Sequence, residues 1–473
     1  MSLLQSPLRS VICDFSKYIW GKITSMGSIS DNNKPFDFAR FKNIDCLEVD
    51  IINHTQNILL QDHLLYCKNN SPYYQKVLDK INPADISLNN LVDLPFTEKA
   101  DIENCNDKFL AVPTEKIVDI VFSSGTIGKS TKIMYTESDL RRLAYNEEKS
   151  LKASGVTSKD IVLLACTMDR CFIAGLAYFL GLRNIGASVV RNGVGSIESH
   201  VEIINRLKPT VIIGVPTFLK KLGEYLRDTG LGSAFSNVNR LVCIGEPIRD
   251  RDMHPLYIAE KLEKLWEAKV YSTYASTETI TTFCECEEQY GGHLLSDLAI
   301  VEIVDEQGNV QLNGELGEVV VTPLSVEGMP LIRFKTGDIS FLIDEPCRCG
   351  RNSPRLGPIV GRKKQMMKVY GTTIYPQSIF SVLDEADFVL DYFLEVFNES
   401  ELSDQVQVFI ALKEGIIGAE KIISEKIKAR IRVKLQVSVL TKETLMERIY
   451  ESGLRKPVRL FDKRSKHLKN YEL

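Results

Sequence analysis

The segment S-S-G-T-I-G-K-S, residues 123–130, combines the residue types that hold a phosphate group. Its glycines let the backbone approach a ligand closely, its hydroxyl groups donate hydrogen bonds, and its lysine supplies a positive charge. Together in one short loop they indicate binding of the phosphates of a nucleotide. The residues that could make these contacts are Ser123, Ser124, Gly125, Thr126, Gly128 and Lys129.

The sequence on either side of this loop distinguishes two ways of binding a phosphate. A Walker loop, G-x-x-x-x-G-K-[ST], runs from a buried strand directly into a helix. Here Ser123 stands in place of the first glycine, and the T-K-I-M-Y-T that follows the loop has the alternation typical of a strand. Since the preceding I-V-D-I-V-F also predicts a strand, we expect a hairpin whose loop binds phosphate. A Walker loop and a polar hairpin tip without a ligand are the alternatives.

Further motifs are spread along the chain in a fixed order. They are L-P-F-T-E-K-A-D-I (94–102), I-G-E-P (244–247), Y-A-S-T-E (274–278), R-F-K-T-G-D (333–338), G-R (361–362), Y-G-T-T-I-Y-P (370–376) and R-K-P-V-R-L-F-D-K-R (455–464). With the loop, this set resembles the adenylate-forming enzymes, the superfamily of acyl-CoA synthetases, luciferases and peptide-synthetase adenylation domains. It is most similar to the phenylacetate–CoA ligase group, whose loop reads SSGTTGKPT. Ile127 and Ser130 depart from that pattern, and Ile127 removes one hydroxyl donor.

The resemblance implies roles for individual residues. Thr277 would contact the α-phosphate, Glu278 would help to hold Mg²⁺, and Asp338 would accept hydrogen bonds from the ribose hydroxyls. Lys456 corresponds to the catalytic lysine of the family. The other nucleotide contacts that the resemblance implies are Gly245, Glu246, Pro247, Tyr274, Ala275, Ser276, Arg362 and Lys364, with Ala275 and Arg455 at family glycine positions.

Three of these residues also have a simpler interpretation. Asp338 could be a turn residue, Glu278 a carboxylate at the start of a helix, and Lys456 a solvated charge in a segment rich in Lys and Arg.

Two C-x-C pairs stand apart from the other cysteines. With a nearby histidine they offer five candidate metal ligands, Cys284, Cys286, His293, Cys347 and Cys349. Four thiolate or imidazole ligands suffice for a closed, structural Zn²⁺ site. The resemblance to some phenylacetate–CoA ligase-like proteins implies Cys286, His293, Cys347 and Cys349, with Cys284 spare or an alternative ligand. Reduced cysteines without a metal are the other interpretation.

The elements that must position these residues follow from the apolar pattern. Short β-rich runs alternate with helical stretches such as residues 196–207 and 217–227, which is typical of βαβ units and a mainly parallel sheet. Residues 299–342 instead read as strands with glycine turns, which suits an antiparallel sheet or a small barrel. The first 115 residues read as helices and loops. The predicted strands of the sheet are 161–166, 187–190, 210–214, 240–245 and 269–273.

The predicted fold class is α/β. A large N-terminal adenylation domain, residues 1–361, would hold doubly wound, mainly parallel sheets and a β subdomain at about 299–345. Residues 362–473 would form a small α+β lid domain, which the resemblance implies is mobile. The first 60 to 70 residues lie outside the resemblance.

The composition excludes several classes of protein. The chain has 473 residues, 44% of them apolar and 25% charged, as in ordinary globular proteins. A formal net charge of -4 argues against nucleic acid or a membrane as partner. The longest apolar candidate, residues 171–182, predicts a buried or amphipathic helix because a membrane span needs roughly 18 residues. Eleven cysteines and no export signal favour a cytoplasmic protein without a disulfide framework.

The function that the resemblance implies is ATP-dependent ligation of a carboxylic acid to CoA through an acyl-adenylate, with AMP and pyrophosphate as products. The acid would be phenylacetate or a related aromatic acid, in a largely apolar pocket near residues 167–172, 215–218 and 271–275. The relatives suggest a homodimer. The alternatives are loading of a carrier-protein thiol, a P-loop NTPase, a zinc-dependent interaction or nucleic-acid module, and a binding protein without activity.

Overall fold

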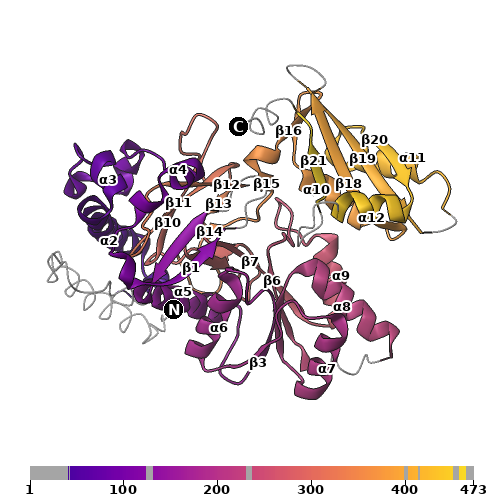
Figure 1. Cartoon of the computed structure of the whole chain (residues 1–473), viewed down its shortest axis with the longest axis horizontal. Helices are drawn as coiled ribbons and strands as arrows, with labels where there is room; N and C mark the ends of the chain where they lie inside the picture. The colour runs from indigo at the N-terminus through magenta and orange to yellow at the C-terminus, as the bar shows by residue number, and fades with distance from the viewer. Residues whose placement is uncertain are drawn as a thin grey trace, which may run out of the picture. The chain divides into compact units, whose positions relative to one another are not determined.

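The computed structural model describes residues 41, 43–123, 131–230, 237–398, 403–413, 416–450 and 458–464. The chain divides into two compact units (Figure 1). Unit 1 consists of residues 1–247, 262–336 and 340–358, and unit 2 consists of residues 248–261, 337–339 and 359–473.

A six-stranded sheet forms the centre of unit 1, in the order β4-β3-β5-β6-β7-β8. The first five strands in this order are parallel and β8 is antiparallel to β7, so the predicted parallel sheet is confirmed. The strands are β3 (Ile161–Ala165), β4 (Ser188–Arg191), β5 (Val211–Gly214), β6 (Arg240–Ile244), β7 (Lys269–Ser276) and β8 (Thr281–Cys284).

Helices cover both faces of this sheet. Figure 1 shows α5 (Glu137–Ala153) and α6 (Ala174–Ile185) on one side and α7 (Ile197–Leu207) and α8 (Pro216–Asp228) on the other. The helix expected from Cys171 begins three residues later, because Arg170 and Cys171 have φ of 60° and 53°, in the left-handed region.

The hairpin predicted around the phosphate loop is confirmed. Strand β1 (Ile117–Phe122) pairs antiparallel with β2 (Lys132–Thr136), with Phe122 opposite Lys132. The next helix, α5, starts only after β2, where Thr136 and Asp139 form a capping box. The chain therefore does not pass from strand to loop to helix, and the Walker alternative is wrong.

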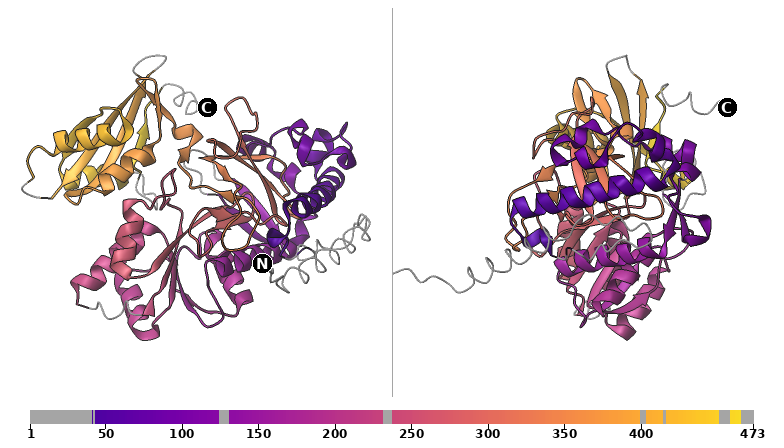
Figure 2. Two further views of the ribbon diagram at one scale, coloured as in Figure 1. Left: turned by 180° about the vertical axis from the view of Figure 1, so that it is seen from behind. Right: turned by 90° about the vertical axis from the view of Figure 1, so that its left-hand side faces the viewer.

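The segment before the hairpin is helical, as expected for the residues that the structure describes. It contains α2 (Val49–Asn70), α3 (Pro72–Val77) and α4 (Lys99–Phe109). Figure 2 (right) shows α2 running across the strands β10 (Ala299–Val304) and β11 (Gly317–Pro323), which are antiparallel as predicted. The Gln56 side chain on α2 donates to the backbone oxygen of Ala299 at 3.1 Å.

Unit 2 contains a four-stranded sheet, in the order β20-β19-β18-β21, and its own apolar core. Strands β18 and β19 are antiparallel, whereas β20 and β21 each pair parallel with a neighbour. The elements are α10 (Pro376–Asp384), β18 (Val389–Asn398), β19 (Asp404–Leu412), α11 (Ala419–Ile431), β20 (Gln436–Leu440), α12 (Lys442–Tyr450) and β21 (Leu460–Asp462).

Short elements complete the chain. The 3₁₀ helices are η1 (Ile44–Cys46), η2 (Pro83–Asp85), η3 (Leu88–Asp93), η4 (Thr114–Lys116) and η6 (Lys363–Gln365). The remaining strands and helix are α9 (Tyr257–Trp266), β9 (Gly292–His293), β12 (Phe334–Ser340), β13 (Leu342–Ile343), β14 (Arg355–Leu356), β15 (Gly361–Arg362), β16 (Met367–Val369) and β17 (Thr372–Ile374).

A buried guanidinium ties α5 to three other segments. Arg142 has no exposed side-chain surface. Its nitrogens donate to the backbone oxygens of Leu324 at 2.7 Å, Leu298 at 2.6 Å and Ile280 at 2.5 Å. Burial lowers the pKa of Arg142 to about 10, so it still carries its charge at neutral pH. The carbonyl dipoles replace the water that a buried cation would otherwise lack.

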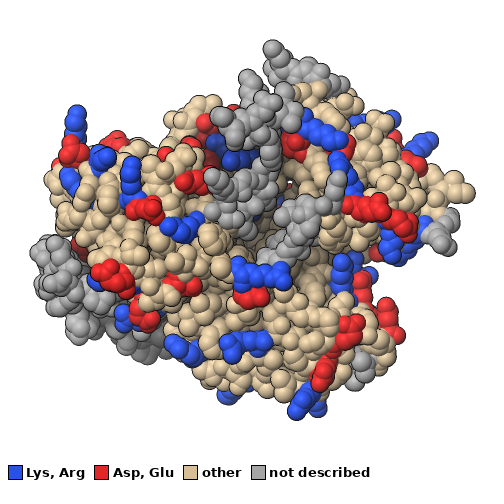
Figure 3. Space-filling model, in the orientation of Figure 1, with Lys and Arg blue, Asp and Glu red and all other residues tan. Residues whose placement is uncertain are grey.

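In the described residues, no helix is long and apolar enough to cross a bilayer. On the face that Figure 3 shows, Lys and Arg side chains are interspersed with Asp and Glu, in keeping with the small net charge.

A buried carboxyl on α5 makes stability depend on pH. Glu147 is almost completely buried, its Oε1 accepts from Thr282 Oγ1, and its Oε2 has no hydrogen-bond partner among the described residues. Burial raises the pKa of Glu147 from 4.5 to about 7. Between these values the folded state binds more protons than the unfolded state, so stability falls as pH rises. The loss is on the order of 3 kcal/mol.

We expect Glu147→Gln to remove this loss because the amide does not ionise. The melting temperature of the variant minus that of the wild type should increase by roughly 5 °C from pH 4.5 to pH 8. Thermal unfolding followed by calorimetry checks this. Glu148→Gln, which changes the neighbouring and partly exposed carboxylate, is the control and should show no such gain. A wild-type minus Glu147→Gln difference that stays constant over this pH range would contradict the assignment.

Candidate functional site

The predicted ligand residues of unit 1 gather at one edge of the six-stranded sheet. Strand β4 lies on one side of β3, and β5, β6 and β7 follow on its other side, so the strand order reverses at β3. Parallel sheets bind ligands outside the carboxyl ends of their strands, at the point where the order reverses. Gly245–Pro247 follow β6, Thr277 and Glu278 follow β7, and the expected acid pocket begins after β3 and β5. The residues of unit 1 that were predicted for the nucleotide and for the acid therefore lie at the same edge of the sheet.

Glu246 already has partners in the structure. Its carboxylate accepts hydrogen bonds from Thr217 N at 3.0 Å and from Thr217 Oγ1 at 2.8 Å. Thr217 lies in the first turn of α8, whose N-cap residue Val215 has no side-chain acceptor. Glu246 therefore caps a helix that starts at the neighbouring strand end, and Gly245, with φ of 74°, makes the turn that brings it there.

Glu278 lies in a turn that side chains of α5 fix by hydrogen bonds. The turn joins β7 to β8, and Ile280 within it has φ of 51°. Arg142 binds the backbone oxygen of Ile280, and Asn146 exchanges two hydrogen bonds with the backbone of Thr282. Ser276 Oγ donates to Glu278 Oε2 at 3.0 Å. The carboxylate is therefore oriented while its side chain stays 12% exposed.

The neighbouring Thr277 is anchored through its backbone. Its carbonyl oxygen accepts from the hydroxyl of Tyr135, a buried residue of β2, at 2.8 Å. The hairpin of β1 and β2 and the turn of Glu278 are thus directly joined by a hydrogen bond. Tyr135 was not among the predicted site residues, since nothing in T-K-I-M-Y-T marks its hydroxyl as different from a core position.

Lys99 joins the start of the phosphate loop to Glu278. Its Nζ lies 3.1 Å from Ser123 Oγ and 3.4 Å from Glu278 Oε1. The sequence motif at 94–102 contains this lysine, but it stands 24 residues before Ser123 and far from Glu278, so no spacing argument could bring the three together.

The remaining predicted residues fall into two groups. Tyr274, Ala275 and Ser276 lie at the end of β7. In unit 2, Asp338 on β12 pairs with Arg362 on β15, with Arg362 Nε 3.3 Å from Asp338 Oδ1, and Lys364 lies in η6. Lys456 and the loop residues Ser124, Gly125, Thr126, Gly128 and Lys129 lie outside the described residues.

Four of the five candidate metal ligands come together in unit 1. The ligand atoms of Cys286, His293, Cys347 and Cys349 all lie within 4.8 Å of one another. The sulfurs of Cys286 and Cys347 are 3.7 Å apart, and His293 Nε2 lies 3.3 Å from Cys349 Sγ. Zn–S bonds of about 2.3 Å in a tetrahedron put two sulfurs about 3.8 Å apart, so the donor set fits zinc. Cys284 is buried but does not belong to the group.

The surroundings of two members of this cluster, His293 and Cys349, favour their ligating forms, whereas burial raises the pKa of Cys286 to about 12 and favours its thiol. Burial, followed by the charges of Arg351 and Arg355, lowers the pKa of His293 to about 3, so the imidazole is neutral. Burial raises the pKa of Cys349, but hydrogen bonds from the backbone and guanidinium of Arg351 outweigh this, and the net change is downward. A neutral imidazole and a stabilised thiolate are the forms that bind a metal.

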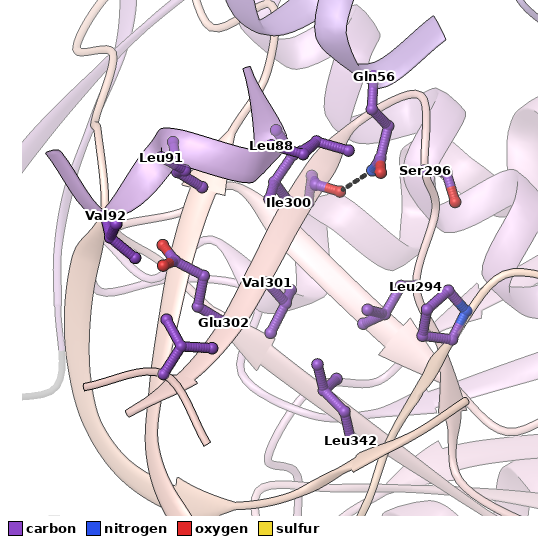
Figure 4. A pocket seen from close by; sticks show the side chains of 13 residues that line it. Gln56, Leu88, Leu91, Val92, Leu294, Ser296, Ile300, Val301, Glu302 and Leu342 are labelled. Carbon is purple, nitrogen blue, oxygen red and sulfur yellow. Dashed lines mark hydrogen bonds between the residues drawn. The ribbon is translucent and has the colours of Figure 1, made fainter. Parts of the chain in front are cut away.

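The cavities among the described residues of unit 1 include a larger and a smaller one. The one of about 410 Å³ is bordered by residues 168–169, which follow β3, and by residues 191–195, which begin at the last residue of β4. The other, of about 240 Å³, lies between α2, η3 and β10 (Figure 4). It is lined mainly by aliphatic side chains and contains none of the predicted site residues.

Comparisons with known proteins agree with this geometry. Residues 64–326 match the family model described as AMP-binding enzyme. Phenylacetate–coenzyme A ligase of Thermus thermophilus is 30% identical over 373 residues, 76% of this chain and 82% of the relative. Phenylacetate–coenzyme A ligase of Pseudomonas putida is 27% identical over 429 residues, 86% of this chain and 94% of the relative.

A solved structure supports the same fold. The crystal structure of 2-hydroxyisobutyryl-CoA ligase in the postadenylation state matches with a TM-score of 0.78 at 19% identity, over 92% of this chain and 97% of that one. The chain belongs to the AMP-binding enzyme family. Within it, the chain is a phenylacetate–CoA ligase-like member, by class an AMP-forming acid–thiol ligase. The predicted fold class and resemblance are confirmed.

The capping role of Glu246 leads to a local prediction. In Glu246→Ala, amide hydrogen exchange in the first turn of α8 should become roughly fivefold faster, as expected when a cap worth about 1 kcal/mol is lost. Exchange measured by mass spectrometry at Thr217 and its neighbours checks this. The first turn of α7, capped by its own Ser196, is the internal control and should not change. Unchanged exchange in α8 would mean that the carboxylate does not hold the helix start.

Proposed function

We propose that this protein is an ATP-dependent carboxylic acid–CoA ligase that forms an acyl-adenylate and acts on phenylacetate or a related aromatic acid. The observation that carries the proposal is the junction of Ser123, Lys99 and Glu278. It joins the start of a phosphate loop, a cation and a carboxylate at the ligand-binding edge of the sheet. The names of the Thermus and Pseudomonas relatives support the aromatic acid.

The chemistry begins with two anions that must be brought together. An oxygen of the substrate carboxylate attacks the α-phosphorus of ATP, the bond from that phosphorus to the bridging oxygen breaks, and pyrophosphate leaves with the electron pair. Thr277 would contact the α-phosphate, the loop from Ser123 would orient the β- and γ-phosphates, and Lys456 would stabilise the developing charge. Mg²⁺, with Glu278 as its protein ligand, would neutralise charge on the phosphates.

The second half-reaction transfers the acyl group. A thiol attacks the acyl carbon of the adenylate, AMP leaves, and the thiol proton passes to solvent or to AMP. AMP is a far better leaving group than oxide, which is the reason for activating the acid first. We propose CoA as the thiol, supported by the relatives; a carrier-protein thiol is the alternative acceptor.

An aromatic acid suits the residues expected around the pocket. Phe172 and Phe218 are half-buried near the carboxyl ends of β3 and β5, and the Phe218 ring packs edge-on against His200 at 4.9 Å between centroids. Burial lowers the pKa of His200, so this neighbour is neutral and adds no charge to the pocket. An apolar wall with few charges favours a ring over a sugar or polyamine.

The remaining features of the proposal follow from the family resemblance. Residues 362–473 would act as a lid domain whose hinge includes Arg362 and Lys364. Asp338 would bind the ribose hydroxyls, which requires its carboxylate to exchange Arg362 for the nucleotide or to bind both. We also propose a homodimer in the cytoplasm, where ATP and CoA are available. Light scattering and cell fractionation test these two points.

The activity is tested with Mg-ATP, CoA and a panel of aromatic and short aliphatic acids, with nucleotides and thioesters measured together by mass spectrometry. We expect AMP and one aromatic acyl-CoA, and at least a hundredfold loss of both in Lys456→Ala, since a single transition-state charge contact is worth roughly that much. Lys152→Ala, which removes an exposed lysine of α5, is the control. ADP in place of AMP, or AMP that forms equally fast in Lys456→Ala, would contradict the proposal.

We also propose that Cys286, His293, Cys347 and Cys349 hold a structural Zn²⁺. Four protein ligands close the coordination sphere, so the ion would cross-link the segments after β8 and β13 and leave no position for a substrate.

Elemental analysis of the purified protein should give about one zinc per chain. Cys347→Ser should lose the metal, because it removes one of four ligands and leaves an incomplete site. Cys284→Ser is the matched control, since Cys284 is equally buried and two residues from Cys286 but outside the cluster. Full zinc content in Cys347→Ser, or loss only in Cys284→Ser, would refute this ligand set.

A further inference from the structure

Lys99 is placed where a structural lysine would be unfavourable. It is the first residue of α4, and a cation at a helix N-terminus opposes the helix dipole. Its side chain is 33% exposed, so burial does not force the position. What it gains are two polar contacts, with the hydroxyl of Ser123 and the carboxylate of Glu278. Both contacts that the described residues make with its ammonium come from the candidate site, which points to a role of this lysine in that site.

The two contacts identify the anion that this lysine would serve. Ser123 opens the loop expected to orient the β- and γ-phosphates, and Glu278 is the expected Mg²⁺ ligand. One oxygen of Glu278, Oε2, accepts from Ser276, and the other, Oε1, faces Lys99. Coordination of a cation by Oε1 would therefore compete with Lys99. An ammonium released from Glu278 stays within reach of Ser123, and the nearest strong anions would then be the terminal phosphates.

We propose that Lys99 is a phosphate-contact residue of the adenylation step, paired with Glu278 in the free enzyme and transferred to the β- and γ-phosphates when Mg-ATP binds. This inference rests on the proposed function. In the free enzyme the lysine keeps the Glu278 carboxylate neutralised and oriented. In the complex its ammonium offsets the charge that builds up on pyrophosphate as the bond between the α-phosphorus and the bridging oxygen breaks. No proton is transferred in this step, so the lysine acts as a fixed charge.

The proposal separates two ligands that share one binding site. ATP carries the β- and γ-phosphates and AMP does not, so loss of Lys99 should weaken only ATP. Damage to the pocket or to the fold would weaken both. A matched control is Lys132→Met, which removes a lysine of similar exposure on β2 whose partner, Asp107, lies at 2.9 Å.

We would measure the binding of Mg-ATP and of AMP by calorimetry for the wild type, Lys99→Met, Lys99→Arg and Lys132→Met. Lys99→Met should bind Mg-ATP about 10- to 100-fold more weakly, the range for one hydrogen bond to a charged group, and AMP within twofold of the wild type. Lys99→Arg keeps the charge and should recover most of the ATP affinity. Lys132→Met should match the wild type for both ligands.

Two results would overturn the role of Lys99. One is ATP affinity within twofold of the wild type in Lys99→Met, and the other is an equal loss of ATP and AMP, which would make the lysine a structural residue. Either result leaves the ligase proposal standing, because the wild type would still bind both nucleotides. A wild-type protein that binds neither nucleotide would instead contradict the proposed function, and the role of Lys99 with it.

Discussion

The candidate site depends on one buried cation. Arg142 on α5 holds the turn that carries Glu278 through Ile280, and the same guanidinium binds the backbone next to β10 and β11 through Leu298 and Leu324. These three carbonyls belong to segments that are far apart in the sequence. A helix that packs between two sheets can fix the position of a segment from each sheet with one planar guanidinium group. Its five N–H donors have a fixed geometry, so they impose direction as well as distance. The price is desolvation of the charge, which three short hydrogen bonds to carbonyl oxygens offset.

Most of the architecture could be predicted because its signals are local. The strands of the parallel sheet are short apolar runs between helices, and the hairpin of the phosphate loop is two alternating segments around a glycine-rich turn. Side-chain contacts across the sheet could not be predicted in this way. Lys99 and Tyr135 reach Ser123, Glu278 and Thr277 only because α4 and β2 meet the end of β7 in three dimensions. The spacing of these residues along the chain does not predict these contacts.

Two predicted ligand residues at the carboxyl ends of β6 and β7, Glu246 and Glu278, also stabilise the fold. Glu246 was expected among the nucleotide contacts, and in the structure its carboxylate caps α8. Glu278 was expected at the metal, and its carboxylate is fixed by Ser276 and Lys99. An unpaired carboxylate at the edge of a sheet would be mobile and would repel an anionic substrate. Intramolecular donors hold each one in place before the ligand arrives, so that less order has to be created on binding.

The cluster of Cys286, His293, Cys347 and Cys349 extends this logic to the N-terminal part of the chain. The backbone oxygen of Asp45 accepts from Asn352 N at 2.6 Å and Ser353 N at 3.2 Å, just after the loop that carries Cys347 and Cys349. The Asp45 carboxylate accepts from Ser296 N, close to His293, and pairs with the half-buried Lys149 of α5 at 2.9 Å. Residue 45 precedes the segment that matches the family model, which begins at residue 64. A segment outside that match therefore fastens both ligand-bearing loops to α5, the helix whose Arg142 and Asn146 hold the turn of Glu278. The geometry of the cluster and the geometry of the nucleotide edge thus share one support.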